Sequence, residues 1–454
     1  MERLNSGDEF RPTFMNISVI GLGKLGTVMA AVFADRGHNV IGVDVNRDVV
    51  ESINNGVPFV REPGLDAMIS RNKERVSATL STEAAVDSTE ITFVVVPTPS
   101  EADGAFSLKY ICDAARATAE AMARMSRYHL VVISSTVMPG SMEDEVRPLL
   151  ERVSGKRCGV DFGLCYNPEF IALGSVIRDM LNPDMVLIGE SDPRAGAMLE
   201  GLYKKVCVNQ PVTVRMNFIN AELAKLSLNT FITTKISYAN MLAELCEQLP
   251  GANVDTVCGA VGLDSRVGKK YLKGALGYGG PCFPRDNKAF AAFSGRLSVD
   301  ATLAKATDEI NNRQVERLAA KILRRVSPQA TVGILGMSYK PDTDVIVESQ
   351  GLILAQSLLS SGLRVTVYDP AAMPAVRQNL KGNVVFSSSM EECAAESTLL
   401  VIATPWDEFK RLQPKHLRPG PPRPILVDWW RILQPESFKE ADYVGCGLGG
   451  IHAF

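Results

Sequence analysis

Short apolar runs alternate with helical patterns along the first half of the chain. Ile17–Gly21 has the pattern of a buried strand and leads through a glycine-rich turn into a helical pattern at Thr27–Arg36, and Asn39–Asp44 follows as a second strand. This order predicts a βαβ unit. Further apolar strands, separated by helical stretches, are expected at Ile91–Val96, Leu130–Ser134 and Met185–Ile188. The alternation favours a doubly wound parallel sheet.

The middle of the chain has a different pattern. From about Thr213 to Gln248 it is helical, with no Gly or Pro inside. A helix of that length rises on the order of 50 Å, at about 1.5 Å per residue. We therefore expect a spine that connects domains. A glycine-rich stretch, Gly274–Gly280, follows it.

A second βα pattern begins at Thr331–Gly336 and continues with strands at Arg364–Asp369, Thr398–Ala403 and Ile425–Val427. The predicted fold class is α/β, with two Rossmann-like domains joined by a long central helix and a helical middle domain. The expected segments are a flexible tail (1–13), an N-terminal Rossmann-like domain (14–212), a central helical domain (213–318) and a C-terminal Rossmann-like domain (319–454).

Composition narrows the function. The chain has 454 residues and a net charge of -3, with 48 Lys+Arg against 51 Asp+Glu, so bulk charge favours neither nucleic acid nor a membrane surface as partner. We expect no membrane span and no signal peptide. The nine cysteines are scattered, without a CxxC pair, which favours a reducing cytoplasm and gives no spacing for a zinc site. The four histidines form no recognisable catalytic constellation, and no metal is expected.

The turn Gly21-x-Gly23-x-x-Gly26 lies between a predicted strand and a predicted helix, which is the context of a dinucleotide fingerprint. Its glycines allow a tight turn, the approach of a pyrophosphate and close helix packing. Asp44 at the end of the next strand would accept the ribose hydroxyls and repel a 2′-phosphate, which favours NAD over NADP. Asp44 could instead only cap a turn, and Arg47 nearby weakens the preference. The second turn, Gly333–Gly336, lacks the full fingerprint, so a second nucleotide-type ligand and a purely structural turn both remain open.

The loop around Cys282 carries the strongest chemical signal. Three glycines precede the cysteine, and Pro284 and Asp286 indicate a helix start directly after it. The helix N-terminus, Arg285 and Lys288 are expected to lower the pKa of the thiol. A free cysteine is more often a small buried hydrophobe, which we expect of the other eight.

At this point the chain resembles the UDP-glucose/GDP-mannose dehydrogenase family. The resemblance covers nearly everything after the tail and rests on the order of separate motifs: Gly21–Gly26 with Asp44, Glu62-Pro-Gly-Leu65, Val96-Pro-Thr-Pro99, Ser135-Thr136, Asn167-Pro-Glu-Phe170, Lys225 with Asn229, Asp264-Ser-Arg-Val-Gly268, the Cys282 loop and Gly336-Met-Ser-Tyr-Lys340.

The resemblance implies a role for each matched residue. Cys282 would be the nucleophile, with Lys225 and Asn229 on one face of the central helix, Asp286 as acid/base group, Glu169 linked to the hydrolytic water and Thr136 ordering the site. Cofactor contacts would come from Gly21, Gly23, Lys24, Leu25, Gly26, Asp44, Pro97, Thr98 and Thr136. Substrate contacts would come from Glu169, Phe170, Lys225, Asn229, Arg266, Tyr271, Lys273, Gly277, Tyr278, Gly279, Gly280, Lys340 and Arg431, with Arg266 reaching into a neighbouring subunit.

The chain departs from the family pattern in three places. Leu173 stands where many members have a second Glu, which leaves Glu169 as the better-supported carboxylate of its loop. Val347 replaces the usual Arg, so a cofactor-phosphate contact would be missing. Asp428-Trp-Trp-Arg431 stands where members often have Asp-Gly-Arg-Arg, so Arg431 would lie beside a bulkier rim.

The implied activity is a four-electron oxidation of a nucleotide-sugar C6 alcohol to the acid with two NAD. Cys282 would form a thiohemiacetal and then a thioester, Lys225 and Asn229 would stabilise the alkoxide, and Glu169 or Asp286 would activate the water. UDP-glucose is the favoured substrate, with GDP-mannose or a UDP-N-acetylhexosamine still open. A two-electron β-hydroxyacid dehydrogenase or a non-catalytic sugar-nucleotide binder are alternatives of another class. A homodimer or higher homo-oligomer is expected.

Overall fold

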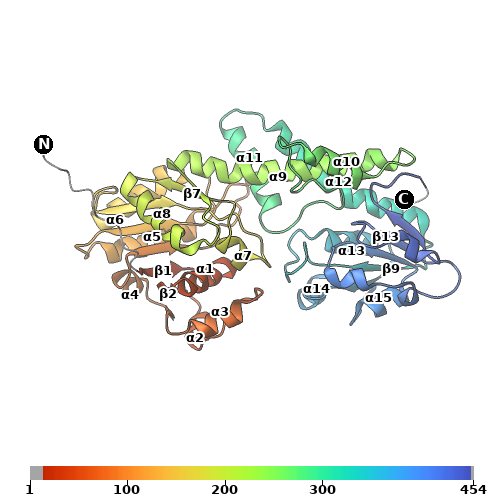
Figure 1. The fold of residues 1–454 in the computed structure, drawn as a ribbon, viewed down its shortest axis with the longest axis horizontal. Coiled ribbons are helices and arrows are strands. Elements are labelled where there is room, and N and C mark those ends of the chain that lie inside the picture. The colour runs from red at the N-terminus through yellow and green to blue at the C-terminus, as the bar shows by residue number, and fades with distance from the viewer. Residues whose placement is uncertain (1–13, 451–454) are drawn as a thin grey trace. The chain divides into compact units, whose positions relative to one another are not determined.

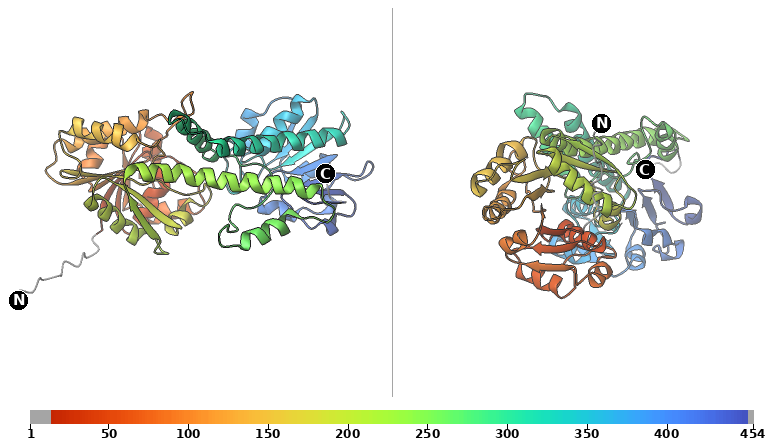
Figure 2. Two further views of the ribbon diagram at one scale, coloured as in Figure 1. Left: turned by 90° about the horizontal axis from the view of Figure 1, so that it is seen from above. Right: turned by 60° about the vertical axis from the view of Figure 1, so that its left-hand side comes forward.

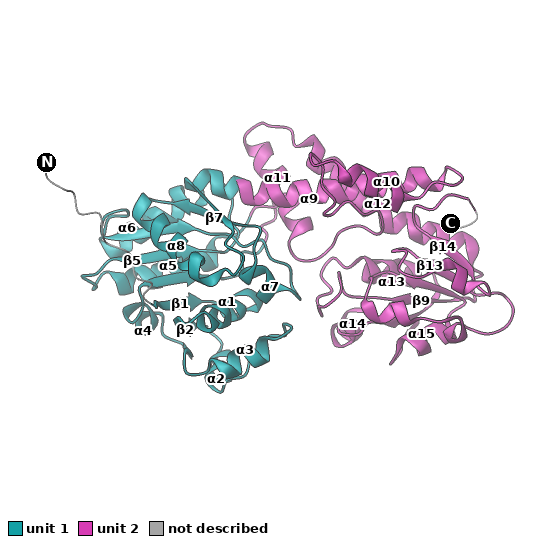
Figure 3. Cartoon of the chain, in the orientation of Figure 1, with its two compact units in different colours: residues 1–99, 106–223 teal, residues 100–105, 224–454 magenta. Residues whose placement is uncertain are grey.

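The computed structural model describes residues 14–450 (Figure 1). The predicted tail, 1–13, lies outside the described residues. The described chain forms two compact units, which Figure 3 colours separately. The first unit holds the described residues up to Pro99 and those from 106 to 223, and the second holds 100–105 and the described residues from 224 onward. The helical middle segment thus belongs to the same compact unit as the C-terminal sheet.

A single sheet organises the first unit, with described strands in the order β3-β2-β1-β4-β5-β6-β7-β8. The strands are β1 (Asn16–Ile20), β2 (Asn39–Val43), β3 (Val76–Thr79), β4 (Ile91–Val94), β5 (His129–Ile133), β6 (Phe162–Tyr166), β7 (Met185–Glu190) and β8 (Val212–Met216). The helices are α1 (Lys24–Asp35), α2 (Arg47–Asn54), α3 (Leu65–Arg71), α4 (Thr82–Asp87), α5 (Lys109–Met122), a π-helical turn (Met142–Val146), α6 (Arg147–Ser154), α7 (Val176–Leu181) and α8 (Pro193–Val206). The predicted βαβ unit β1–α1–β2 is confirmed.

The core of this unit lies between the sheet and α1. Helix α1 buries its whole run from Gly26 to Ala34, and Phe33 packs its ring 5.0 Å from that of Phe93 on β4. Strands β1, β4 and β5 are nearly or fully buried, as their continuous apolar runs predict for parallel strands covered on both faces. These strands end at one edge, where their following loops carry most of the predicted cofactor residues.

The expectation of an all-parallel sheet is wrong at one pair. Strand β7 pairs antiparallel to β6, while β7 and β8 are parallel to each other. The connection from β6 to β7 contains only the short helix α7, which packs against α1. Because no helix carries the chain back across the sheet, β7 enters from the end at which β6 leaves.

The predicted start of the central helix is also wrong. Val212–Met216 forms strand β8, and helix α9 runs from Phe218 to Glu247, which is 30 residues. All three residues of Val-Thr-Val at the start of this strand are β-branched, and such residues suit a strand at the edge of a sheet better than a first helical turn. The long central helix itself is confirmed, with a length of about 45 Å.

Six parallel strands form the sheet described in the second unit, in the order β11-β10-β9-β12-β13-β14. They are β9 (Thr331–Leu335), β10 (Arg364–Tyr368), β11 (Val384–Phe386), β12 (Leu399–Ile402), β13 (Ile425–Asp428) and β14 (Asp442–Gly445). The helices after α9 are α10 (Val254–Leu263), α11 (Phe283–Arg296), α12 (Thr302–Arg325), α13 (Gln350–Ser360), α14 (Met373–Asn379) and α15 (Met390–Glu396). Figure 2 shows α12 running alongside α9. The second Rossmann-like pattern is confirmed.

Candidate active site

The glycine-rich turn after β1 has the geometry that a pyrophosphate requires. Gly21 has a φ of +95°, and a Cβ there would lie 2.3 Å from the Val95 carbonyl oxygen. A Cβ on Gly26 would lie 1.8 Å from the Gly21 carbonyl oxygen, so only glycine lets α1 pack this closely. Gly23 is the N-cap of α1, and a Cβ there would have no atom within 4 Å. The turn is therefore closely packed at Gly21 and Gly26 and has free space at Gly23, at the helix N-terminus beside Lys24 and Leu25. This combination fits the binding of a dinucleotide pyrophosphate.

Asp44 lies directly after β2 and is bound to this turn. Its Oδ2 accepts a hydrogen bond from the Leu22 N–H at 2.8 Å, and its Oδ1 accepts one from the Asn46 N–H at 2.9 Å. The turn-capping role is thus present. Each carboxylate oxygen keeps a second lone pair, so these contacts leave room for ribose hydroxyls, and that role stays a prediction.

Two loops at the carboxyl edge of the sheet are tied together by one hydroxyl. Ser135 Oγ donates to the Val96 carbonyl at 2.7 Å and accepts from the Val96 N–H at 2.9 Å. This joins the loop of Pro97 and the buried Thr98 to the loop of the half-buried Thr136. These predicted cofactor residues are therefore held on one framework within the first unit.

The Asn167-Pro-Glu-Phe loop follows β6, and its carboxylate is held by a residue that the sequence did not indicate. The Tyr203 hydroxyl of α8 lies 2.7 Å from Glu169 Oε1 and 2.5 Å from Asn167 Oδ1. Asn167 in turn donates its Nδ2 to the Leu187 carbonyl at 2.9 Å. Burial, and next the Glu169 charge, raise the pKa of Tyr203 well above its usual 10, so the hydroxyl stays a donor. No local pattern links Tyr203 to a loop this far back in the chain.

The Glu62-Pro-Gly motif supports the same loop from another side. The buried Glu62 carboxylate accepts hydrogen bonds from the Gly174 N–H at 2.9 Å and the Val176 N–H at 2.7 Å. It therefore caps helix α7 and fixes the end of the segment that contains Leu173. The side chain of Leu173 packs against the apolar core, which suits a residue that has lost a charge.

Cys282 is the N-cap of helix α11 in the second unit, as its flanking sequence predicted. All nine cysteines lie in the described residues, and Cys282 is exposed whereas Cys112 is half-buried and the other seven are buried. Asp286 lies one turn on and is 1% exposed. It accepts a hydrogen bond from Asn229 Nδ2 at 2.7 Å and lies 3.3 Å from Arg285 Nη2. Lys225, on the same helix face as Asn229, is only 7% exposed.

The expected low pKa of Cys282 is wrong in this structure. Protein groups around the accessible thiol desolvate it, and the Asp286 charge adds to that effect, so together they raise its pKa above the usual 9.0. Lys225 and Arg285 act in the opposite direction but do not outweigh the two. The sequence argument counted the cations and the helix N-terminus but not the cost of desolvating a thiolate. The thiol is therefore protonated at neutral pH.

The glycines before Cys282 pack where no side chain would fit. A Cβ on Gly279 would lie 2.2 Å from the Glu348 carbonyl oxygen, and one on Gly280 would lie 2.5 Å from the Tyr339 ring. Gly280 also donates its N–H to the Val347 carbonyl at 2.9 Å. The segment is thus fitted against the loop that carries Lys340 and the Val347 departure.

The remaining predicted substrate residues differ in their surroundings. Tyr271 is exposed, has a φ of +63° and lies edge-on to Phe283, the residue after the cysteine. Lys273 is exposed, whereas Phe170 and Lys340 are half-buried. Arg266 is exposed and pairs with Asp264 at 2.7 Å.

Arg431 has a more specific place than its prediction implied. Its guanidinium donates to both carboxylate oxygens of Asp255 and to the carbonyls of Trp429, Cys446 and Gly274. These contacts use all five N–H groups. A contact between Arg431 and the substrate stays a prediction. In the structure, Arg431 holds Gly274, the first residue of the segment Gly274–Gly280.

The structure thus brings the predicted residues together in two groups. Cys282, Asp286, Asn229, Lys225 and the glycine segment lie in the second unit. The glycine-rich turn, Asp44, Thr98, Thr136 and Glu169 lie in the first. No cluster of three or more potential metal ligands occurs in the described residues. Over the same residues, no helix is both long and apolar enough to cross a membrane.

Comparison with known proteins agrees with this arrangement. Models of the UDP-glucose/GDP-mannose dehydrogenase family match the chain over the NAD binding domain (15–207), the central domain (219–313) and the UDP binding domain (333–435). The chain belongs to this family. It is an NAD-dependent nucleotide-sugar dehydrogenase, as the resemblance implied.

Individual family members show how far the likeness extends. UDP-glucose 6-dehydrogenase AglM of Haloferax volcanii is 36% identical over 402 residues, which cover 88% of this chain and 93% of that protein. The structure of a UDP-glucose dehydrogenase from Pyrobaculum islandicum is 34% identical, covers 100% of both chains and has a TM-score of 0.86. GDP-mannose 6-dehydrogenase of Azotobacter vinelandii is 31% identical over 412 residues, which cover 88% of this chain and 93% of that protein.

Proposed function

We propose that this family member oxidises the C6 alcohol of UDP-glucose to the carboxylate through a covalent intermediate on Cys282. The observation that carries the proposal is the thiol at the N-cap of α11, beside the buried Asp286, Asn229 and Lys225. The choice of UDP-glucose is supported by the relatives of 36% and 34% identity, both named for that substrate.

NAD, when bound at the glycine-rich turn, supplies the hydride acceptor for both oxidations. At the aldehyde stage, the Cys282 sulfur forms a bond to C6 and gives up its proton, and the carbonyl oxygen becomes the oxygen of a thiohemiacetal. Lys225 and Asn229 carry the donors that stabilise negative charge on this oxygen. Loss of a hydride from C6 to a second NAD, and of the hydroxyl proton to a base, converts the thiohemiacetal to a thioester. In the last step a water oxygen bonds to the thioester carbon, the C–S bond breaks, and the sulfur regains a proton as the acid leaves.

The raised pKa of Cys282 is compatible with this role. A thiol that is neutral at rest does not repel an incoming pyrophosphate, and a thiolate of high pKa is the stronger nucleophile. The proton that it loses needs an acceptor. Asp286 and Glu169 are the two carboxylates proposed for acid/base work, and Tyr203 and Asn229 hold them in fixed orientations.

Titration calorimetry with the intact protein tests the substrate. UDP-glucose, GDP-mannose and a UDP-N-acetylhexosamine are compared, each with and without NADH. The proposal predicts that UDP-glucose binds most tightly and is the one oxidised to an acid. Tighter binding and turnover of GDP-mannose would move the protein to another substrate of the same family, and the absence of turnover with all three would overturn the proposed activity.

We further propose a homodimer, formed through helix α9. Four large apolar side chains are exposed along one side of the helix, from its middle to its C-terminal end: Phe231, Tyr238, Met241 and Leu245. A cavity of about 340 Å³ lies beside Met241 and Leu245, between α9 and α12. Such a stripe is unfavourable in water, and the same helix of a second copy would cover it symmetrically. Sedimentation of the intact protein and of Phe231→Glu with Leu245→Glu tests this, since the double variant should shift toward the monomer.

The cytoplasm is the proposed location. Nine free thiols, including an exposed one needed for catalysis, support a reducing compartment.

A further inference from the structure

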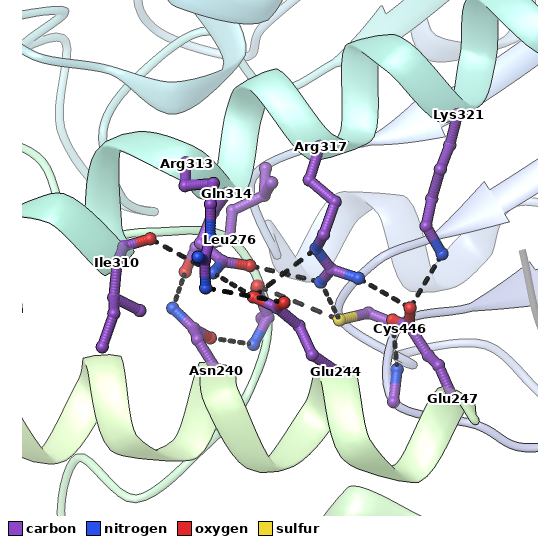
Figure 4. Close-up of polar contacts among 12 residues, drawn as sticks. Asn240, Glu244, Glu247, Leu276, Ile310, Arg313, Gln314, Arg317, Lys321 and Cys446 are labelled. Carbon is purple, nitrogen blue, oxygen red and sulfur yellow. Dashed lines mark hydrogen bonds and ion pairs between the residues drawn. The ribbon is translucent and has the colours of Figure 1, made fainter. Parts of the chain in front are cut away.

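The segment Gly274–Gly280 belongs to no strand, and its backbone is bonded by side-chain amides. Asn240 on α9 is fully buried and faces the start of the segment (Figure 4). Its Oδ1 accepts from the Ala275 N–H at 2.7 Å, and its Nδ2 lies 3.4 Å from the Leu276 carbonyl oxygen. One amide therefore satisfies a donor and an acceptor of the chain, as a neighbouring strand would.

Asn311 on α12 makes the same kind of paired contact with Tyr278, two residues after Leu276. Its Oδ1 accepts from the Tyr278 N–H at 2.7 Å, and its Nδ2 donates to the Tyr278 carbonyl at 3.1 Å. Gln350 on α13 donates to the same carbonyl at 3.2 Å. Two helices, α12 and α13, thus hold the backbone N–H and carbonyl of Tyr278, which lies between two glycines predicted to face the substrate.

The segment is packed closely against these amides at Gly277. A Cβ on Gly277 would lie 2.4 Å from Asn311 Oδ1 and 2.9 Å from Gln350 Oε1. Asn311 is 4% exposed and Tyr278 is 5% exposed, so water cannot replace these bonds without opening the structure. An aspartate would offer only acceptors, and an apolar residue would offer neither group.

We propose that Asn311, together with Asn240, is a positioning residue that sets the backbone of Gly274–Gly280 for the nucleotide-sugar. This inference rests on the proposed function, which assigns that segment to the substrate. Glycines give a backbone that can approach a ligand closely but keeps little conformation of its own. The buried amides supply the missing order, so the binding surface is formed before the substrate arrives.

The test compares Asn311→Ala and Asn311→Asp with the matched control Asn312→Ala, which removes the exposed neighbouring amide. Hydrogen exchange at the Tyr278 amide and calorimetric affinities for UDP-glucose and NADH are measured on each intact protein. Asn311→Ala should raise the exchange rate and weaken UDP-glucose binding roughly tenfold or more, which is about 1.4 kcal/mol. Affinity for NADH should not change. Asn311→Asp should be intermediate, because it keeps the acceptor for the Tyr278 N–H.

A purely structural role predicts another result. Asn311→Ala would then lower the melting temperature, while the folded protein would keep its affinity for UDP-glucose, and that outcome overturns the inference. An unchanged exchange rate at Tyr278 would also overturn it. If the unaltered protein binds no nucleotide-sugar, the proposed function fails instead, so the two failures can be told apart.

Discussion

At the level of single residues, the surroundings of Cys282 set the charge of its thiol, and this charge governs the proposed chemistry. The effects on the pKa of the thiol oppose one another. Desolvation and the Asp286 charge raise the pKa, whereas Lys225 and Arg285 lower it. A thiol held neutral at rest is less exposed to oxidation than a permanent thiolate. It becomes a nucleophile only when a nearby group accepts its proton.

Alkylation kinetics should report this balance. The rate of iodoacetamide labelling at Cys282 should keep rising above pH 9, the usual value, because the thiolate forms only there. Asp286→Asn removes a like charge, so the midpoint should move down and labelling at neutral pH should accelerate. Lys225→Met removes a positive charge that lowers the pKa of the thiol, so the midpoint of the labelling curve should move up. Peptide mass spectrometry separates Cys282 from Cys112, and a midpoint near 7 in the unaltered protein would contradict the assignment.

The Tyr203 hydroxyl should matter for the hydrolytic step. Tyr203→Phe removes the donor that lies 2.7 Å from Glu169 Oε1, so the carboxylate that we associate with water activation loses its orientation. We expect kcat to fall roughly tenfold or more with little change in KM for the sugar. A rapid burst of NADH followed by slow turnover, with a sugar adduct on Cys282, would show that hydrolysis is affected. A variant with unchanged kcat would contradict the role of this contact.

At the scale of elements, helices α9 and α12 are joined by a network of charged and polar side chains (Figure 4). Glu247 on α9, which is almost fully buried, accepts from Arg317 at 2.6 Å and Lys321 at 2.8 Å, and also from the Gly447 N–H at 3.0 Å. Burial alone would raise the pKa of Glu247, but Arg317 and Lys321 outweigh it and hold the pKa below 4.5. The network keeps the two helices that carry Asn240 and Asn311 in register.

Glu247→Gln should therefore destabilise the protein in a pH-dependent way. A carboxylate with a depressed pKa contributes stability above its unfolded value of 4.5, and that stability is lost as the pH falls through the folded pKa. At pH 7 the variant should lose about 3 kcal/mol, because the cations lose their buried partner. The difference from the unaltered protein should shrink below pH 4.5 in urea titrations. Glu316→Gln, at an exposed position on α12, is the control, and equal effects of the two would refute the network.

Elements with strong periodicity could be predicted from the sequence, and those set by distant partners could not. The βαβ turn at Gly21–Gly26, the central helix and the α11 start after Cys282 follow from local rules of backbone and helix geometry. Strand β8 forms because β7 offers a free edge, and the reversal of β7 depends on where α7 packs. The support of Glu169 by Tyr203 and of Tyr278 by Asn311 likewise joins residues far apart in sequence.

At the scale of the whole molecule, the proposed assembly joins catalysis to the second copy. Arg266 is exposed and forms an ion pair with Asp264, two residues before it, so its exposed side chain could contribute across an interface. We expect Arg266→Ala and Cys282→Ala each to be inactive, and activity to return when the two folded proteins exchange subunits. In a mixed two-fold dimer both changes fall in one site and the other is intact. A mixture that stays inactive after mass spectrometry has shown exchange would place Arg266 in its own subunit.

The stoichiometry of NADH per sugar tests the covalent mechanism on Cys282. With limiting UDP-glucose and excess NAD, this mechanism predicts about two NADH and one uronic acid per sugar, with no free aldehyde, because Cys282 holds the carbon between the oxidations. Cys282→Ala should form no acid while keeping its affinity for NADH. One NADH per sugar with release of an aldehyde or ketone, or normal acid production by Cys282→Ala, would contradict the covalent mechanism.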